Sequence, residues 1–194
     1  MQLRRWLGSL CLALGAGLGF VQTYGLPFGW NRGPGSRWWE SLRRAIARQV
    51  AAIDEGAGPR PVVHAEFAGA LDRNLPETEQ WLHDMGFVRN PIARLKTRDG
   101  TPEAGSWVYR ESPLARRQLH FMLFESDDGG IAVYAHEELS SVHPLYGPGH
   151  FRGEGQSVGA GVERARELLP LDTEGALDDP PDEPWQVAAE STQE

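Results

Sequence analysis

Residues 118 to 136 read Gln118-Leu-His-Phe-Met-Leu-Phe124, Glu125-Ser-Asp-Asp-Gly-Gly130 and Ile131-Ala-Val-Tyr-Ala-His136, and this stretch decides the fold. The two outer segments are short, largely apolar runs bounded by turn-forming residues, as expected of strands. The glycines of the middle segment supply the positive φ angles that a tight connection between antiparallel strands needs. The stretch therefore predicts a β-hairpin.

Four further segments extend the hairpin into a domain. Residues 62–67 alternate between apolar and polar side chains as a half-buried strand does, and residues 105–110 form another short strand pattern. Residues 76–85 and 158–169 have apolar side chains at helical spacing. Strands and helices in this order predict an α+β domain over residues 62–169, an antiparallel sheet of about four to five strands with helices on one face.

The N-terminal segment has no charged residue between Trp6 and Trp30. As a helix rising 1.5 Å per residue, its apolar run 6–21 would cover roughly 24 Å. The uncharged residues that follow would complete the span of about 20 residues that a bilayer requires. We therefore predict a hydrophobic membrane anchor at residues 1–30, preceding the domain, with these residues at the lipid interfaces: Arg4, Arg5, Trp6, Tyr24 and Trp30.

Two alternatives to an anchor stay open for residues 1–30. A cleaved signal peptide fits the basic start and apolar core and would export the protein, although no convincing small-residue cleavage site follows. A hydrophobic tail that does not insert is the other alternative. For an anchored chain, two arginines precede the apolar segment and five lie within about 20 residues after it. The positive-inside rule then places the domain on the cytoplasmic side.

A second helix is predicted within residues 31–61, a basic amphipathic region that ends in a glycine- and proline-rich linker. Residues 36–53 place apolar side chains on one face and arginines on the other. The pattern fits a helix lying in the lipid headgroups. It fits equally a helix that packs on the domain and exposes a basic face. The interpretation as a membrane helix assigns these residues to the interface: Trp38, Trp39, Arg43, Arg44 and Arg48.

Charge is unevenly distributed along the chain, whose formal net charge is −8. Residues 1–60 contain eight arginines and three carboxylates, whereas residues 170–194 contain eight carboxylates and no base. This charge distribution predicts a basic end near an anionic bilayer and an acidic, disordered tail at residues 170–194. Residues 61–169 have 11 basic and 16 acidic residues, which argues against nucleic acid as a partner.

The histidines are the candidate chemistry of this sequence. Strand alternation places His64 and Glu66 on one face of the first predicted strand, and His120 and His136 both lie in the hairpin. Histidine and carboxylate side chains of this kind bind zinc or a similar divalent ion. The candidate ligands are therefore His64, Glu66, His120, His136, Glu137, His143 and His150. None has the spacing of a recognised metal motif, and amphipathic histidines on a wet sheet face are the simpler interpretation.

Several short segments resemble a known group of proteins: residues 118–124, Val133-Tyr-Ala-His-Glu137, His143-Pro144, His150-Phe-Arg-Gly153, Gly161-Val162-x-x-Ala-Arg166, Gly86-Phe87-x-Arg-Asn-Pro91 and Gly105-Ser-Trp107. Together they are similar to small membrane-anchored haloarchaeal proteins of uncharacterised function, over about residues 62–169. The scarcity of lysine, with Lys96 alone, and the acidic excess agree with that group. The resemblance implies a membrane-proximal domain and no particular catalysis.

The sequence supports two functional hypotheses. The preferred one is a membrane-anchored, non-catalytic interaction or structural domain that uses no cofactor and contacts membrane lipid and a protein partner. The alternative is a histidine-based metal-binding protein or a metal-dependent hydrolase. Whether the protein is an enzyme, and its oligomeric state, are left open by the sequence.

Overall fold

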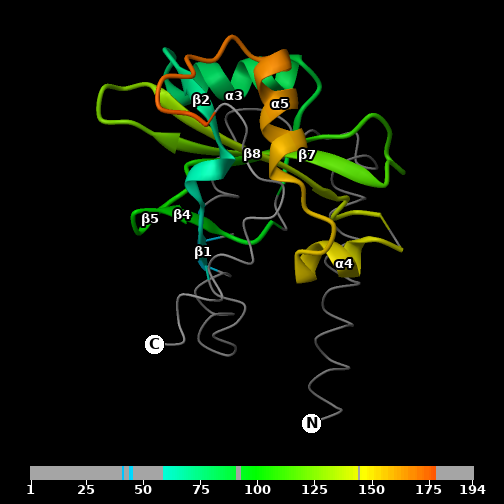
Figure 1. The fold of residues 1–194 in the computed structure, drawn as a ribbon. Helices are drawn as coiled ribbons and strands as arrows, with labels where there is room; N and C mark the ends of the chain where they lie inside the picture. The colour runs from blue at the N-terminus through cyan, green and yellow to red at the C-terminus, as the bar shows by residue number, and fades with distance from the viewer. Residues whose placement is uncertain (1–40, 42–43, 46–58, 91–92, 144, 178–194) are drawn as a thin grey trace, which may run out of the picture.

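A five-stranded antiparallel sheet forms the centre of the molecule (Figure 1). The computed structural model describes residues 41, 44–45, 59–90, 93–143 and 145–177. The sheet order is β2-β8-β7-β6-β3. Its strands are β2 (Phe67–Leu71), β3 (Val88–Arg89), β6 (Gly105–Tyr109), β7 (Arg117–Glu125) and β8 (Ile131–Leu139). The predicted α+β class and antiparallel sheet are confirmed.

The predicted hairpin is the central strand pair of this sheet. β7 and β8 pair over nine residues, from Arg117 opposite Leu139 to Glu125 opposite Ile131. Gly129 has a φ of 88° in the connection, as a tight turn requires. Side chains alternate along a strand, so those of β7 and β8 point in turn to the two faces of the sheet. Different elements cover these two faces.

Two helices cover one face of the sheet. The helices α3 (Leu75–Asp84) and α5 (Val158–Leu168) lie on the same side in Figure 1 and share the main hydrophobic core with β6, β7 and β8. Asn74 caps the start of α3 by accepting a hydrogen bond from the backbone N–H of Glu77, and Ser157 caps α5 in the same way through Ala160. Both predicted helices are therefore present, with ends shifted by about one residue.

A small second sheet lies across the opposite face, below the central sheet in Figure 1. It consists of β1 (Arg60–Pro61), β4 (Lys96–Arg98) and β5 (Thr101–Pro102), with β1 parallel to β4 and β4 antiparallel to β5. Asp99 and Gly100 both have positive φ, which gives the turn between β4 and β5 the twist that a two-residue hairpin favours. The short helix α4 (Gly147–Arg152) follows β8 near this side.

The start of the domain differs from its prediction. Residues 62–67 do not form a strand: His64–Glu66 is the single 3-10 turn η3, and the strand β2 begins only at Phe67. The Glu66 carboxylate accepts a hydrogen bond from the backbone N–H of Val63, which closes this turn locally. Consequently His64 and Glu66 do not share a strand face as the alternation predicted.

The domain also extends past residue 169, where the sequence placed its end. Asp172 and Ala70 exchange two backbone hydrogen bonds, of 2.7 and 2.9 Å, which continue the sheet beyond β2. Leu171 packs on the main core. Residues 170–177 therefore belong to the folded unit, while residues 178–194 of the predicted tail lie outside the described residues.

Most of the predicted membrane-directed region lies outside the described residues, including the anchor at 1–30. Of the predicted amphipathic helix, Ser41, Arg44 and Ala45 are described and are helical. The Arg44 guanidinium donates a hydrogen bond of 2.8 Å to the backbone carbonyl of Glu103. This contact favours packing of that segment on the domain. Among the described residues, no helix has the length and apolar character to cross a membrane.

Candidate metal centre

Three buried side chains meet on the sheet face opposite α3 and α5. His120 on β7 is the register partner of His136 on β8, and Glu138 follows on the same face two residues later. The distance from His120 Nδ1 to His136 Nε2 is 3.3 Å. The Glu138 carboxylate lies 3.3 Å from each of these two nitrogens, through Oε1 and Oε2 respectively. The three side chains thus form a triangle in which each nitrogen faces a different carboxylate oxygen, and one potential ligand atom from each side chain lies within 4.8 Å of the other two.

Each member of this triangle is held by a further side chain. The second ring nitrogen of His120 lies 2.7 Å from Ser106 Oγ, and that of His136 lies 2.7 Å from Glu66 Oε1. The Gln118 amide donates a hydrogen bond of 2.6 Å to Glu138 Oε1. Groups of this kind orient the ligands of metal sites, since a coordinating imidazole usually gives its other N–H to a carboxylate or another acceptor.

The protonation states of the cluster follow from burial and from its carboxylates. Burial lowers the pKa of His120 to about 4, so this ring is neutral near pH 7. Burial also disfavours the imidazolium of His136, but hydrogen bonds to Glu138 and Glu66 outweigh it and raise the pKa of that ring. Burial would raise the pKa of Glu66, yet Lys96 and His136 lower it to about 2. Without a metal, the two carboxylates therefore favour the protonated form of His136.

Glu138 is the second of those carboxylates. Burial acts to raise its pKa, but the nearby histidines, first His150 and then His120 and His136, hold the pKa well below its usual value. It is therefore ionised at neutral pH and has negative charge available for a cation.

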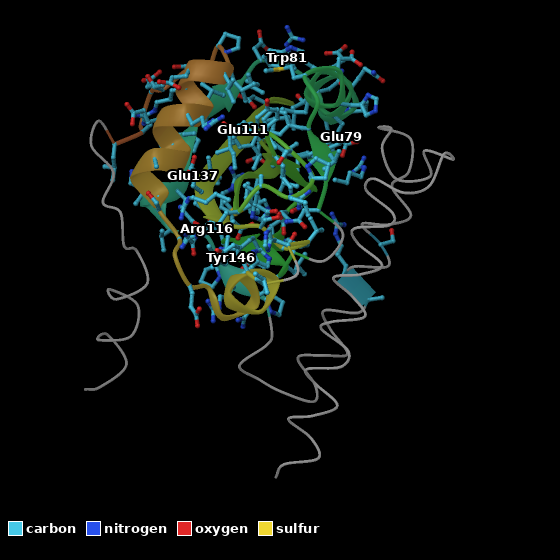
Figure 2. All side chains as sticks on the ribbon, turned by 90° about the vertical axis from the view of Figure 1, so that its right-hand side faces the viewer. Glu79, Trp81, Glu111, Arg116, Glu137 and Tyr146 are labelled. Atoms are coloured by element: carbon cyan, nitrogen blue, oxygen red, sulfur yellow. The ribbon has the colours of Figure 1, made fainter. Side chains whose placement is uncertain are left out.

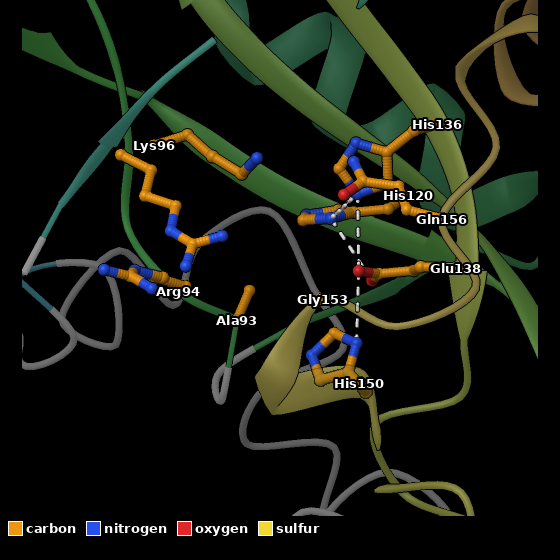
Figure 3. Close-up of a pocket in the computed structure, with 10 residues that line it drawn as sticks. Ala93, Arg94, Lys96, His120, His136, Glu138, His150, Gly153 and Gln156 are labelled. Atoms are coloured by element: carbon orange, nitrogen blue, oxygen red, sulfur yellow. Dashed lines mark hydrogen bonds and ion pairs between the residues drawn. The ribbon is translucent and has the colours of Figure 1, made fainter. Parts of the chain in front are cut away.

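The triangle lies at one wall of a small pocket of about 40 Å³ (Figure 3). A volume of that size holds a few water molecules, or an ion with one or two waters, because one water needs roughly 10–15 Å³. Lys96 points its ammonium group across the pocket towards the histidines, and its Nζ lies 3.7 Å from Glu66 Oε1. Arg60, Arg94, His150 and Gln156 also line the pocket. The wall opposite the triangle is therefore basic.

The distance between the two histidine nitrogens of the triangle is close to that of tetrahedral coordination. Zinc binds nitrogen and oxygen at about 2.0–2.1 Å in tetrahedral sites, which puts neighbouring ligand atoms roughly 3.3–3.4 Å apart. The two nitrogens are 3.3 Å apart, and each lies 3.3 Å from one oxygen of Glu138, Oε1 for His120 and Oε2 for His136. Binding of an ion by the two nitrogens and a single carboxylate oxygen would require Glu138 to bring one oxygen towards both nitrogens and His136 Nε2 to lose its proton.

The structure brings together four of the predicted metal candidates. His120 and His136 are in the triangle, Glu66 contacts His136 from outside it, and His150 Nδ1 lies 3.1 Å from Glu138 Oε2 on the far side of that carboxylate. Figure 3 shows Glu138 between His150 and the other two histidines. His150 therefore borders the candidate site without belonging to the triangle.

Three predicted candidates lie elsewhere. His64 is exposed, with its ring 6.5 Å from that of Phe67. His143 Nδ1 accepts a hydrogen bond from the backbone N–H of Leu145 and so shapes a turn. Glu137 points to the other face of β8, towards α5 (Figure 2), where Arg117 lies 3.0 Å and Arg164 3.7 Å from its carboxylate. The structure does not bring these three side chains to the triangle.

Sequence reasoning missed Glu138 and the supporting residues Ser106, Lys96, Gln118 and Gln156. The signal for Glu138 was present, because residues i and i+2 of a strand share a face and His136 was already a candidate. Gln118 has the same relation to His120. Lys96 and Gln156 reach the site from other segments, and no local pattern in the sequence indicates them.

Comparison with known proteins adds no assignment: no protein-family model, no curated protein and no solved structure matches the chain. The resemblance to haloarchaeal membrane-anchored proteins therefore stays a prediction.

Proposed function

We propose that this protein binds a divalent transition-metal ion, zinc in the first instance, through His120, His136 and Glu138. The observation that supports the proposal is the triangle of three buried side chains that offer ligand atoms within 4.8 Å of one another, each side chain oriented by a further group. Two imidazoles and one carboxylate are ligands that zinc and related ions accept. Glu66, Ser106 and Gln118 would orient the ligands from outside the coordination sphere.

The proposed site is of the open kind. His120, His136 and Glu138 would supply three protein ligands, and they line the same pocket as Lys96, which would leave room there for water or another ligand. Sites with three protein ligands and one exchangeable position are typical of catalytic zinc, whereas structural zinc has four protein ligands. Metal-dependent hydrolysis is the reaction class that such a site would support, and metal binding is the part of the hypothesis to test first.

The test is metal content and thermal stability of the full-length chain in detergent, with zinc and with a chelator. Zinc at about 100 times its dissociation constant stabilises the folded protein by about 2.7 kcal/mol, which raises the melting temperature by roughly 10 °C. Glu138→Gln removes one ligand charge while keeping the side-chain shape and should abolish this rise. Glu137→Gln, on the opposite face of the same strand, is the matched control. Near-zero metal content and no response to zinc in the wild type would refute the proposal.

We also propose that residues 1–30 hold this domain at a membrane, on the cytoplasmic side. The supporting observation is the uncharged stretch between Trp6 and Trp30 with arginines on both sides. In this account, membrane attachment sets location while the metal site supplies chemistry, so the two proposals are independent. Recovery of the protein in the membrane fraction, resistant to high salt and carbonate, is expected. Recovery in the soluble fraction with an intact N-terminus would contradict attachment.

A further inference from the structure

The pocket in front of the triangle has a basic wall that the fold places there through strand pairing. Arg60 on β1 and Lys96 on β4 are direct register partners in the parallel pair of the small sheet. Directly paired residues project their side chains to the same side of a sheet, and both of these residues line the pocket. Arg94 lines the same pocket two residues before Lys96. Three cationic side chains therefore border the space that a bound metal would face.

The two carboxylates of the site are engaged by protein groups. Glu66 accepts hydrogen bonds from Val63 and Gln156 and contacts His136, while Glu138 contacts Gln118 and the histidines. In the proposed metal-bound state, the pocket has the divalent ion on one wall and the cationic side chains of Arg60, Arg94 and Lys96 in its lining. In a space of low dielectric constant, cationic groups on both sides of a pocket favour an anion between them.

From this we infer that the pocket binds a small oxyanion group, a phosphate or a carboxylate, which occupies the open position of the metal and contacts Arg60 and Lys96. The inference rests on the proposed metal site and names the class of ligand for it. Arginine and lysine beside a metal ion are the groups that recognise phosphate and carboxylate oxygens. The volume of about 40 Å³ limits the buried part of the ligand to a group of this size, with the rest of the molecule outside.

The experiment is calorimetric titration of inorganic phosphate, and separately of acetate, into the full-length protein loaded with one equivalent of zinc. Arg60→Gln removes one charged contact and should weaken binding of the preferred anion about tenfold, since hydrogen bonds to charged groups contribute about 1.5–3 kcal/mol. Arg98→Gln is the matched control: Arg98 lies on the same strand as Lys96, but it contacts the Glu125 carbonyl and the Phe124 ring. The larger of the two responses identifies phosphate or carboxylate as the preferred group.

The outcomes separate this inference from the metal proposal, because zinc content is measured for every variant before the titration. Zinc-loaded protein that binds neither anion, or that binds one equally well in the wild type and in Arg60→Gln, would overturn the inference and leave the metal proposal standing. A wild type that takes up no zinc would overturn both. A tenfold loss in Arg60→Gln alone, with zinc content unchanged and Arg98→Gln like the wild type, would support the inference.

Discussion

Gly161 allows α5 to approach the strand that presents His136, and replacing it tests that arrangement. A Cβ atom built at Gly161 would lie 2.2 Å from the Cα and 2.3 Å from the carbonyl carbon of His136, and 2.4 Å from the backbone nitrogen of Glu137. Ordinary contacts of a Cβ atom begin at 3.4 Å. All three neighbours are backbone atoms of a central strand, so the helix itself must move away by about 1 Å.

The expected loss of stability for Gly161→Ala can be worked from these distances. Overpacking of this kind costs about 1–3 kcal/mol, and a clash with strand backbone belongs at the upper end or above it. Alanine recovers about 1 kcal/mol through its higher helix propensity. The net loss is therefore about 2 kcal/mol, which lowers the melting temperature by roughly 8 °C for a domain of this size.

The assay combines chemical denaturation with zinc titration of the same variant. Displacing α5 from the backbone of His136 should also weaken zinc binding, since that residue is a proposed ligand. Gly159→Ala changes a half-buried glycine two residues earlier in the helix and should raise the free energy of unfolding by up to about 1 kcal/mol, through the same helix propensity. If Gly161→Ala melts like the wild type and binds zinc equally well, the close approach of helix and strand described here is wrong.

Three further predictions concern the charges of the site. Glu66→Gln should weaken zinc binding about 10- to 100-fold, because it removes the carboxylate that orients His136. Glu137→Gln should bind zinc like the wild type. If direct titration gives Glu66→Gln and the wild type the same affinity for zinc, Glu66 does not orient His136. The pKa of His136 is raised in the metal-free protein, so zinc binding near pH 6 should release about one proton. Calorimetric titration in several buffers measures this proton, because the heat of binding then depends on the buffer. A heat that is independent of the buffer would argue against coordination of zinc by His136. The pKa of His120 is lowered by burial from 6.5 to about 4, so between these pH values the unfolded chain binds a proton that the folded chain does not, and the metal-free protein should lose stability as the pH falls from 6.5 to 4. Denaturation curves at pH 6.5, 5.5 and 4.5 measure this loss. A free energy of unfolding that rises as the pH falls would refute the lowered pKa of His120.

The elements that could be predicted from the sequence are those whose signal is local. The hairpin of β7 and β8 and the helices α3 and α5 follow from apolar spacing and turn residues within one segment each. The segment 62–67 was misjudged because its alternation of side chains suits a strand, whereas the Glu66 carboxylate closes a 3-10 turn that no periodicity indicates. The strands β1, β4 and β5 have two or three residues each and exist only through their pairing.

The candidate site likewise contains some residues whose positions follow from local sequence and others that only tertiary packing brings there. Register within a hairpin is nearly fixed once the turn is known, so His120 and His136 could be placed together from the sequence. Glu66 reaches His136 across 70 residues of sequence, and this contact depends on β2 lying beside β8. Lys96 comes from the second sheet, whose existence the sequence did not indicate. Contacts of this kind arise from tertiary packing alone, and they supply the charge that decides the chemistry.

The sheet face that contains the triangle has an apolar end and a polar end, and comparing them indicates why the triangle residues are polar. At one end of β7 and β8, the face is filled by Met122, Phe124, Ala132 and Tyr134, which form a small hydrophobic cluster. A few residues along the same two strands, this face presents Gln118, His120, His136 and Glu138, all buried. Buried charges of this kind contribute little net stability, and apolar residues of similar volume often stabilise a fold more. The first end shows that the strands accept apolar residues on this face. Packing therefore does not require the buried, charged cluster at the polar end of this face. Because the polar end borders the pocket, ligand binding is the better explanation for the cluster.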